Sequence, residues 1–555
     1  MSDDGNLVVR DYVIIGGGPA GVQLGYYLQQ AQRDYVIVEA ESSCGAFFRR
    51  HPRHRKLLSV NKLYTGCSDR ERQLRWDWNS LLGPEDDVPF SAYSREYFPD
   101  AGSLARYIDD FARRHALRVL FQTRIVSISR LSHGSAGQGK GEHGHKGYEL
   151  TAQDGKRIRA RRLIIASGFT QPHIPTVDGI ELSEPYTEMS TEPSDYIDQR
   201  VLILGKGNSA FETADSLVST ARSIHLVSPQ PVEFAWRSHF VGHLRAVNNN
   251  LLDTYQLKIQ NAVLDAHVDH IRREGSAYVA RMRYVHNTEI EDLTYDRVLN
   301  CTGFRFDPSF FEADCWPEMR SCGRLPSMSA SWESTNLTGV HFAGTLTQAR
   351  DYKRTSSAFI HGFRYNSKAL FHMLEKQDRG IAWPGQPVEP TADALSRAML
   401  ERINTSSALW QQFGFFCDVV QIHREGGATY LQELPLEYAL EHPEIYGSEC
   451  FAVTLEYGKN KLTDPFNQAG RVVRTDVGHA DDSAFLHPVV RHYRAGELKA
   501  THHVIEDLAS EWIEPEHVNP LRAFVGEQLG VAIPLVSDIR ELHGARRGRA
   551  KSKVG

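Results

Sequence analysis

Two stretches of the chain share one pattern, in which an unbroken apolar run ends at glycines and a helical segment follows. They are "DYVIIGGGPAGVQLGYYL" at 11–28 and "RVLILGKGNSAFETAD" at 200–215. An unbroken apolar run is typical of a parallel strand that is buried on both faces. The pattern therefore predicts two α/β units, each beginning with a buried strand, a tight turn and a helix.

The alternation of strand-like and helix-like segments divides the chain into four predicted stretches, 1–178, 179–320, 321–380 and 381–555. The stretch 321–380 is predicted to return to the first unit and to end in the helix-like segment "TSSAFIHGFRYNSKALFHML". The first and third stretches would then form one domain, with the second stretch inserted between them.

Residues 381–555 are predicted to form a mixed α/β extension, with strand-like "CFAVTLEYG" at 450–458 and helix-like "HHVIEDLASEW" at 502–512. The expected fold class is therefore α/β, with two Rossmann-like dinucleotide-binding domains followed by this extension. Two roles are open for the extension, a cap over the active site and a homodimer contact.

Composition narrows the class of protein. The chain has 555 residues, of which 41% are hydrophobic and 24% charged, and a formal charge of −6 that argues against a nucleic-acid binder. It has no apolar run of about 18 residues and no room for a cleavable signal before the first strand, so we expect a cytoplasmic protein without a membrane partner. The loop "SHGSAGQGKGEHGHKG" at 132–147 and the basic tail "GARRGRAKSKVG" are expected to be solvated, and no metal site is predicted.

The first turn has Gly16, Gly18 and Gly21 in GxGxxG spacing. In this motif the first glycine permits a tight turn, the second lets the backbone approach a pyrophosphate, and the third lets the helix pack on the strand. The helix begins at Pro19 and Ala20, where free N–H groups attract phosphate. A dinucleotide is the expected ligand.

The strand after each turn distinguishes the two sites. "YVIVEA" ends in Glu39 and Ala40, where a carboxylate can bind both ribose hydroxyls. After the second turn, "SIHLVS" ends in Ser228. A serine with Arg237 or Arg222 near it accepts the 2′-phosphate that a carboxylate would repel, so NADPH is predicted over NADH.

Three further strands each end in a turn of small residues, "RRLIIASGFTQPHIP" at 161–175, "DRVLNCTGFRFDP" at 296–308 and "VHFAGT" at 340–345. With the two glycine turns, they resemble the two-dinucleotide-binding-domain flavoproteins, which hold FAD at the first turn and NAD(P)H at the second. The resemblance implies an FAD site of Gly16, Gly18, Pro19, Ala20, Gly21, Glu39, Ala40, Val126, Ser167, Gly168, Gly344 and Thr345. It implies an NADPH site of Gly205, Gly207, Asn208, Ser209, Ala210, Ser228, Arg237, Thr302 and Gly303. Thr345 stands where many members have aspartate.

Longer segments narrow the resemblance: "FFRRHPRHRKLLSVNKLYTG", "LRWDWNSLL", "GKGNSAFETADS", "HFVGHLRAVNNNLLDTYQLK", "AFIHGFRYNSKAL", "FLHPVVRHY" and "HHVIEDLASEW". They are similar to the FAD-dependent oxidoreductase domain-containing 2 family, which is related to class B flavin monooxygenases. The vertebrate member acts in the endoplasmic reticulum. We do not expect that role here, because the sequence lacks a signal peptide and a retention tetrapeptide.

The electron acceptor is predicted from the cysteines. A disulfide reductase of this architecture needs a CxxC or CxxxxC pair beside the flavin, and none of the seven cysteines forms one. Oxygen is the remaining acceptor: class B flavin monooxygenases form a flavin C4a-hydroperoxide that oxidises a soft nucleophile. "SVNK" at 59–62 resembles their asparagine-bearing segment, which implies Asn61 and Lys62 at the reacting edge of the flavin.

The predicted function is an FAD- and NADPH-dependent monooxygenase that oxidises the nitrogen of a small, amino-acid-like metabolite. The cationic run 49–62, with Lys62, Arg49, Arg50, Arg53 and Arg55, suits a substrate that carries a carboxylate, and the phosphates of NADPH are the other expected partner. One departure counts against a monooxygenase, since the FxGxxxHxxxW/Y fingerprint of that class is missing before the second turn. A reductase or oxidase with another acceptor, and a flavin-stabilised binding protein, remain as alternatives.

Overall fold

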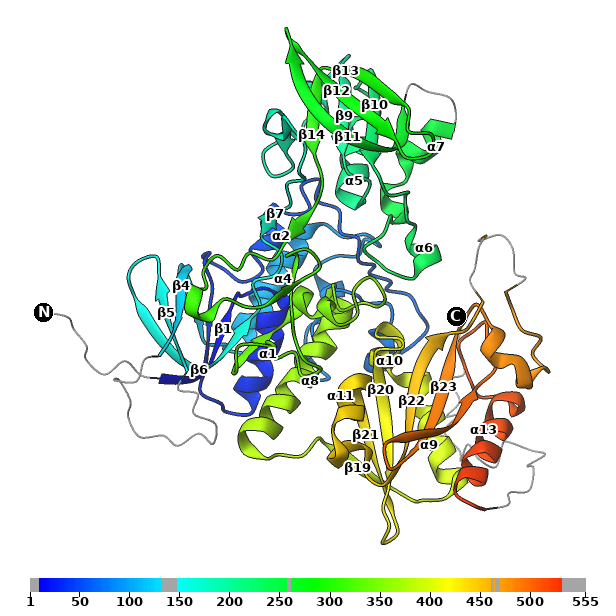
Figure 1. Ribbon diagram of the computed structural model, residues 1–555. Helices are drawn as coiled ribbons and strands as arrows, with labels where there is room; N and C mark the ends of the chain where they lie inside the picture. Colours follow the sequence, from blue (N-terminus) through cyan, green and yellow to red (C-terminus); the bar gives the residue numbers. More distant parts are fainter. Residues whose placement is uncertain (1–8, 132–146, 257–260, 461–463, 465–469, 532–555) are drawn as a thin grey trace, which may run out of the picture. The chain divides into compact units, whose positions relative to one another are not determined.

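The computed structural model describes residues 9–131, 147–256, 261–460, 464 and 470–531 of the chain. The segment 132–146 and the basic tail, both expected to be solvated, lie outside this part. Contacts divide the chain into a first unit, Met1–Gly66 with Trp76–Leu374, and a second unit, Cys67–Arg75 with Glu375–Gly555. Figure 1 labels the elements of both.

The first unit contains a seven-stranded sheet of order β3-β2-β1-β6-β5-β4, with β18 beside β6. Its strands are β1 (Val9–Ile15), β2 (Tyr35–Val38), β3 (Val119–Leu120), β4 (Ile125–Arg130), β5 (Tyr148–Ala152), β6 (Arg157–Ile165) and β18 (Val340–Phe342). β1, β2, β3, β6 and β18 run parallel. Val13 and Ile14 of β1 are 0% exposed, as expected for a parallel strand covered on both faces.

Helices follow this sheet at both positions where the sequence predicts one, after the first glycine turn and after β18. α1 (Pro19–Gln30) packs against β2 and α4 (Ala101–Arg114), and α8 (Ile360–Arg379) follows β18. β18 pairs in parallel with β6, so the chain returns to its first sheet after the insertion. The helix predicted from residue 355 begins at Ile360.

A second seven-stranded sheet has the order β13-β12-β11-β10-β9-β14-β8. Its strands are β8 (Glu184–Pro185), β9 (Arg200–Leu204), β10 (Ser223–Ser228), β11 (Ala262–Glu274), β12 (Ala277–Tyr284), β13 (Ile290–Tyr295) and β14 (Arg297–Asn300). β8, β14, β9, β10 and β11 run parallel, and α5 (Asn208–Leu217) connects β9 to β10. The prediction of two dinucleotide-binding domains is confirmed by these two sheets.

The turns that follow β6 and β14 each continue into a short strand, and these two strands pair with each other. β7 (Gln171–Pro172) lies antiparallel to β15 (Phe304–Arg305), and β16 (Met319–Arg320) pairs with β17 (Leu325–Pro326). The shorter helical elements are α2 (Phe47–Arg50), α6 (Ala235–Ser238), α7 (Asn250–Gln256), η1 (Phe90–Ala92), η2 (Ile180–Leu182), η3 (Pro193–Tyr196), η4 (Ala246–Asn248), η5 (Ala313–Cys315) and η6 (Gly344–Ala349).

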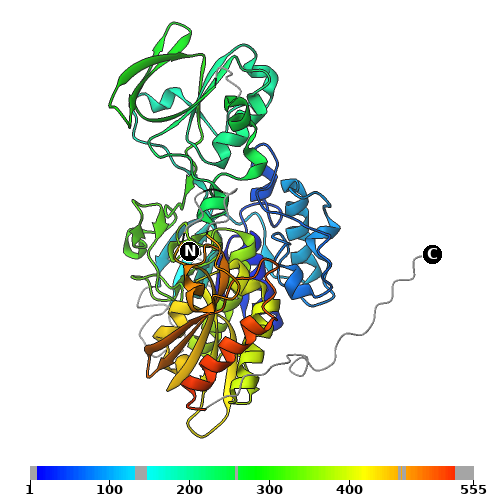
Figure 2. The same cartoon turned by 90° about the vertical axis from the view of Figure 1, so that its right-hand side faces the viewer.

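The second unit is built on a six-stranded antiparallel sheet of order β19-β21-β20-β22-β23-β24. Its strands are β19 (Gly385–Val388), β20 (Phe416–Ile422), β21 (Ala428–Pro435), β22 (Glu449–Tyr457), β23 (Leu486–Arg494) and β24 (Glu497–His503). Its helical elements are α3 (Arg70–Gln73), α9 (Ala392–Thr405), α10 (Ser407–Gln411), α11 (Leu436–Glu441), α12 (Pro443–Tyr446), η7 (Val477–Asp482) and α13 (Pro515–Gln528). α13 lies across one face of the sheet, shown in red in Figure 2, and Phe524 packs on Phe451 and His502.

One expectation for this unit is wrong. The segment 502–512, predicted as a helix, instead completes β24 and continues as turns. Val504, Ile505 and Trp512 are each at most 1% exposed, and the Trp512 indole donates a hydrogen bond to the carbonyl of Ile505 at 3.2 Å. Burial of these side chains in the tertiary core outweighs the weak helical periodicity.

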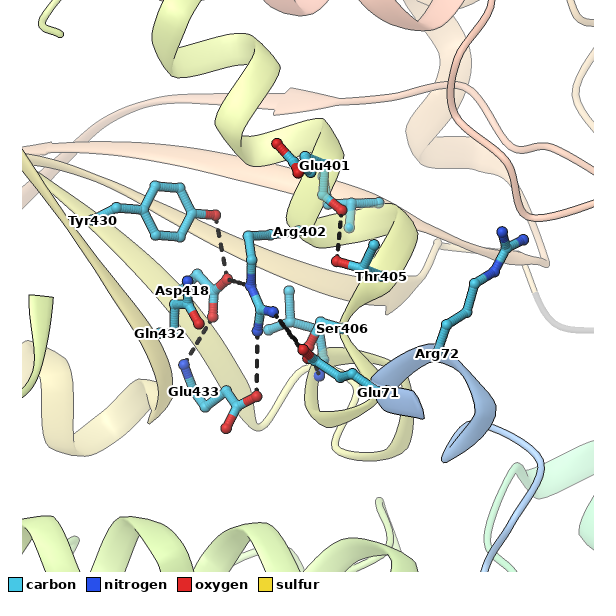
Figure 3. A network of polar contacts seen from close by, with 12 residues as sticks. Glu71, Arg72, Glu401, Arg402, Thr405, Ser406, Asp418, Tyr430, Gln432 and Glu433 are labelled. Atoms are coloured by element: carbon cyan, nitrogen blue, oxygen red, sulfur yellow. Dashed lines mark hydrogen bonds and ion pairs between the residues drawn. The ribbon is translucent and has the colours of Figure 1, made fainter. Parts of the chain in front are cut away.

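Residues 67–75 join the second unit through buried charges. Arg402 of α9 contacts Asp418 at 3.1 Å, Glu433 at 3.3 Å and Glu71 of α3 at 2.9 Å (Figure 3). Arg75 is 2% exposed and donates hydrogen bonds to the carbonyls of Ile403 and Ser406. A short piece of chain that the predicted boundaries leave in the first domain is thus held by the extension.

Within the described residues, no helix combines the length and the hydropathy that crossing a membrane requires.

Candidate active site

The first glycine turn joins β1 to α1. Gly16 has a φ of +113°, and a Cβ there would lie 2.6 Å from the carbonyl oxygen of Ala166. A Cβ on Gly21 would lie 2.0 Å from the carbonyl oxygen of Gly16, so the protein's own packing requires glycine at both positions. A Cβ on Gly18 would meet no atom within 4 Å. Position 18 therefore borders open space.

The N-terminus of α1 lies at this turn. Gly18 caps the helix without a side-chain hydrogen bond, so the first-turn N–H groups at Ala20 and Gly21, after Pro19, are open to an anion. Gly344 approaches closely from η6, since a Cβ there would lie 2.7 Å from the Cβ of Ala20. The turn thus offers backbone N–H donors beside a space that no side chain fills.

Glu39 directly follows β2, and backbone N–H groups orient its carboxylate. Its Oε2 accepts a hydrogen bond from Gly17 at 2.7 Å and its Oε1 from Glu41 at 2.9 Å, and the residue is 9% exposed. Each oxygen keeps a lone pair that suits a ribose hydroxyl. Ala40 follows it in the chain, and Val126 lies on β4 with 47% of its surface exposed.

The remaining predicted FAD residues lie at the ends of β6 and β18. The Ser167 hydroxyl is buried without a partner in the described part of the chain, and a Cβ on Gly168 would meet no atom within 4 Å. The Thr345 hydroxyl donates to the carbonyl of Ala358 at 2.6 Å, so this departure from aspartate serves the loop before α8. The orphaned hydroxyl and the open glycines fit the predicted FAD.

The second turn repeats this geometry between β9 and α5. Gly205 has a φ of +116°, with a Cβ position 2.5 Å from the carbonyl oxygen of Cys301, whereas a Cβ on Gly207 would meet no atom within 4 Å. Gly207 caps α5 without a side-chain hydrogen bond, and Ser209 and the buried Ala210 lie in its first turn. The turn therefore also fits a diphosphate.

Two predicted NADPH residues have side chains engaged within the protein. The Asn208 amide donates to the carbonyls of Gly242 and His243 and accepts a hydrogen bond from the backbone N–H of Arg245 at 3.0 Å. The Thr302 hydroxyl donates to Asn300 Oδ1 at 2.7 Å, beside Gly303. The side chains of Asn208 and Thr302 are used in hydrogen bonds within the protein. A cofactor at these two positions would therefore be bound by backbone groups.

The end of β10 is where a 2′-phosphate is expected. Ser228 lies opposite Asp265 of β11, whose carboxylate pairs with the buried Lys206. Arg222 precedes β10 and lies at the opposite end of the strand from Ser228, about 20 Å away at the rise of an extended chain. Of the two arginines weighed for this phosphate, the exposed Arg237 of α6 is the one that follows Ser228.

Replacing Arg237 with methionine should raise the KM for NADPH about tenfold and leave the KM for NADH unchanged, since an ion pair with a phosphate is worth about 1.4 kcal/mol or more. The matched control is Arg222→Met, for which both KM values should stay at those of the wild type. Steady-state kinetics with both nucleotides checks this. An equal effect of the two replacements would contradict the assignment.

Most of the cationic run at 49–62 is engaged in internal contacts. Arg53 donates to the carbonyls of Thr187 and Met189 at 2.8 and 2.6 Å, Arg50 pairs with Glu41 at 2.9 Å, and Arg55 donates to the carbonyl of Phe48 at 2.8 Å. The side chains of Arg49 and Lys62 are exposed. The run therefore gives little support to a carboxylate site.

Asn61 is 2% exposed and held in one orientation. Its Nδ2 donates to the carbonyl of Ser94 at 2.8 Å, its backbone N–H donates to the carbonyl of Tyr97, and it forms an antiparallel bridge with Asp77. Its Oδ1 is buried without a partner in the described part of the chain. Buried acceptors are normally hydrogen-bonded, so this oxygen is suited to accept a hydrogen bond from a bound group.

Three residues that the sequence analysis did not assign lie together in the first unit. The rings of Trp78 and His361 stack at 4.2 Å between centroids and 27° between planes. The Arg245 guanidinium lies 5.1 Å from the centroid of the Trp78 ring. The segments quoted for the family resemblance contain all three residues, but no spacing could place residues 78, 245 and 361 side by side.

All seven cysteines fall within the described residues, and all are free. Cys44, which follows β2 near the first turn, is 0% exposed, and burial raises the pKa of its thiol to about 12. Burial likewise raises the pKa of Cys301 to about 12. The two thiols with these raised pKa values are therefore protonated near neutral pH.

Comparisons with known proteins agree with this geometry. Residues 13–344 match a family model described as "Pyridine nucleotide-disulphide oxidoreductase". A Mus musculus protein named "FAD-dependent oxidoreductase domain-containing protein 2" is 35% identical over 93% of this chain and 83% of its own length.

Two solved structures have a similar chain. A bacillithiol disulfide reductase from Staphylococcus aureus is 18% identical, with a TM-score of 0.48, over 67% of this chain and 99% of its own. A flavin-containing monooxygenase from Stenotrophomonas maltophilia is 19% identical, with a TM-score of 0.49, over 66% of this chain and 98% of its own. The two names describe different reactions.

Proposed function

The chain belongs to the family of FAD-dependent oxidoreductase domain-containing protein 2, and we propose that it is an FAD- and NADPH-dependent monooxygenase of a small nitrogen-containing metabolite. It is an oxidoreductase that uses FAD at the first turn and a pyridine nucleotide at the second. Bound FAD takes a hydride from the nicotinamide and supplies the electrons to an acceptor. The proposal concerns that acceptor.

The state of Cys44 is the observation that favours oxygen over a disulfide as the electron acceptor. This residue is the cysteine beside the first turn, it has no cysteine partner, and a thiol with a pKa of about 12 is protonated at pH 7 and a poor nucleophile. Thiol and disulfide exchange therefore has no suitable group at this turn. Molecular oxygen remains: two electrons from NADPH reduce one oxygen atom to water, and the other oxygen atom bonds to the substrate nitrogen.

Asn61 is proposed to face the reacting edge of the flavin. Its amide is anchored at Nδ2 by Ser94, which leaves the buried Oδ1 to accept a hydrogen bond there. Lys62, the next residue, has an exposed side chain and is proposed as a positive charge beside Asn61. Oxidation at nitrogen is proposed from the resemblance to class B flavin monooxygenases, whose oxidised flavin intermediate reacts with soft nucleophiles such as amines.

The deciding experiment measures NADPH, oxygen and hydrogen peroxide together in the FAD-loaded protein, with a panel of amines and amino acids. A substrate should acquire one oxygen-18 atom from labelled oxygen, while peroxide falls below the NADPH consumed. Peroxide equal to NADPH for every compound, or efficient disulfide reduction, would assign a reductase or oxidase instead. No NADPH oxidation would indicate a flavin-stabilised binding protein.

Replacing Asn61 with alanine should lower the rate of product formation about 100-fold while NADPH oxidation continues, because a positioned polar group at a reacting centre is worth about that much. Peroxide release should rise in proportion. Asn79→Ala is the control, since Asn79 is also buried but its Nδ2 donates to the carbonyl of Val60 at 3.2 Å. The control should lower the melting temperature without changing the ratio of product to peroxide. Unchanged coupling in Asn61→Ala would remove Asn61 from the mechanism.

A further inference from the structure

Residues 67–75 lie early in the chain but belong to the second unit, where Arg75 anchors them. Arg75 is 2% exposed, and its guanidinium donates hydrogen bonds of 2.6 and 3.2 Å to two carbonyls at the C-terminal end of α9, where a cation is favoured. The guanidinium also lies 4.9 Å from the centroid of the Trp410 ring, and the Gln411 amide donates to the Arg75 carbonyl at 2.8 Å. Both the side chain and the main chain of Arg75 are therefore fixed by the second unit.

Two ion pairs fix the same segment closer to its start. Glu71 contacts Arg402 at 2.9 Å, and Arg72 pairs with Glu511 at 2.8 Å. Arg402 also pairs with carboxylates of β20 and β21, so its own position is set by the sheet of the second unit (Figure 3). The segment 67–75 therefore cannot shift without breaking contacts inside the second unit.

The residues on either side of this segment pair with each other in the first unit. Two backbone hydrogen bonds, of 3.1 and 3.2 Å, connect residues 60–62 to residues 76–78. Between these bonds, Asn61 forms an antiparallel bridge with Asp77. The chain therefore makes a hairpin that carries Asn61 in one strand and the segment 67–75 in its loop.

The loop of this hairpin, residues 63–75, is too long to set the pairing of the two strands by itself. Loops of about two to five residues fix the register of a hairpin through their own turn geometry. A longer loop gives that constraint only when other parts of the protein hold it. Because side chains alternate between the two faces of a strand, a slip of one residue would turn the Asn61 side chain to the opposite face.

The first unit also holds the hairpin, which limits the effect to be expected. The Asn61 amide donates to the carbonyl of Ser94 at 2.8 Å, and Arg364 of α8 donates to two carbonyls of residues 77–80 at 2.9 and 2.7 Å. The end of that strand next to the loop, by contrast, follows directly on Arg75. Loss of the contacts to the second unit should therefore loosen the loop end of the hairpin without unfolding it.

From these contacts we propose that the second unit positions Asn61 by fixing the loop of its hairpin, and that Arg75 is the positioning residue. The extension then has a role other than the two left open by the sequence, a cap and a homodimer contact. The importance of this role for catalysis rests on the proposed function, which puts Asn61 at the flavin. The hold on the hairpin does not depend on it.

The test measures hydrogen–deuterium exchange by mass spectrometry in the full-length, FAD-loaded protein. In Arg75→Met, backbone exchange over residues 58–64 and 76–80 should be about tenfold faster than in the wild type, since hydrogen bonds from a buried charged donor contribute about that much to local stability. Gln411→Met removes a single hydrogen bond to the Arg75 carbonyl and should give a smaller increase in the same peptides. The ratio of product to peroxide should fall in both variants.

Arg491→Met is the matched control. Arg491 forms a largely buried ion pair with Glu456 inside the sheet of the second unit, at 2.5 and 2.8 Å, so its loss should lower the melting temperature and leave exchange over residues 58–64 unchanged. Wild-type exchange in both Arg75→Met and Gln411→Met, or an equal increase in Arg491→Met, would overturn the proposal. Faster exchange with an unchanged ratio of product to peroxide would support the hold on the hairpin and refute the role proposed for Asn61.

Discussion

Replacing Gly18 with alanine is expected to give a folded protein that purifies largely without FAD. A Cβ at position 18 meets no protein atom within 4 Å and the residue has ordinary extended backbone angles, so the apoprotein should tolerate it. The methyl group would occupy the space that a diphosphate needs above α1. Such overpacking costs about 1 to 3 kcal/mol, which corresponds to a roughly 5- to 150-fold loss of FAD affinity. Flavin absorbance and apoprotein titration measure it.

Gly207→Ala is the counterpart at the second turn, where a Cβ is equally unobstructed. It should keep its FAD and show a KM for NADPH raised roughly 5- to 150-fold by the same argument. Gly21→Ala differs from both, because its Cβ would lie 2.0 Å from a carbonyl oxygen and the turn itself should fail to form. Normal FAD content in Gly18→Ala would show that the ligand does not approach that turn.

Arg402→Met is expected to destabilise the second unit by about 3 to 5 kcal/mol, or roughly 6 to 20 °C in its melting temperature. The replacement leaves Asp418, which is 0% exposed, and Glu433 without their cation (Figure 3). Differential scanning fluorimetry of the full chain, with limited proteolysis to assign the transition, measures the loss.

The loss should depend on pH with a definite sign. Burial raises the pKa of Asp418 even though Arg402 opposes the shift, and removal of Arg402 raises it further. A carboxyl with a raised pKa in the folded state loses stability as pH rises from its unfolded pKa of about 3.9 through its folded pKa. The deficit against the wild type should therefore be smallest near pH 4 and grow toward neutral pH.

Arg494→Met is the control for this variant. Arg494 pairs with Glu449 at 2.9 Å on the same sheet, but its side chain is 55% exposed, so its removal should cost less than about 1 kcal/mol. Arg402→Met combined with Asp418→Asn should recover part of the loss. Equal deficits for Arg402→Met and Arg494→Met, or no pH dependence, would contradict the importance of the buried cluster.

Much of the fold follows from short-range sequence chemistry. The strand, the glycine turn and the helix N-terminus of each dinucleotide unit are consecutive in the chain, so the roles of Gly16 and Gly205 could be predicted before any tertiary contact was known. The helix expected at 502–512 was wrong for the complementary reason. Trp512 and Ile505 are buried by distant partners, and local periodicity does not register such packing.

The candidate active site could be predicted only in part. Asn61 was found through a resemblance, and the cysteine spacing excluded a redox pair. The arginines at 50, 53 and 55 drew attention by their density, yet the structure engages them with a carboxylate and backbone carbonyls. Arg245 gave no such signal, because it is a single arginine in an ordinary segment.

By itself, the sequence determined the two glycine turns, the carboxylate of Glu39 after the second strand, the serine at the matching position 228, and the lack of a CxxC or CxxxxC pair, since each depends on residues close together in the chain. The tertiary structure alone decided which of the arginines at 49–62 pair within the protein, and it brought residues 78, 245 and 361 together. The physical reason is that hydrogen bonds, ion pairs and ring stacking act over a few ångströms, between segments whose separation along the chain carries no trace of their proximity.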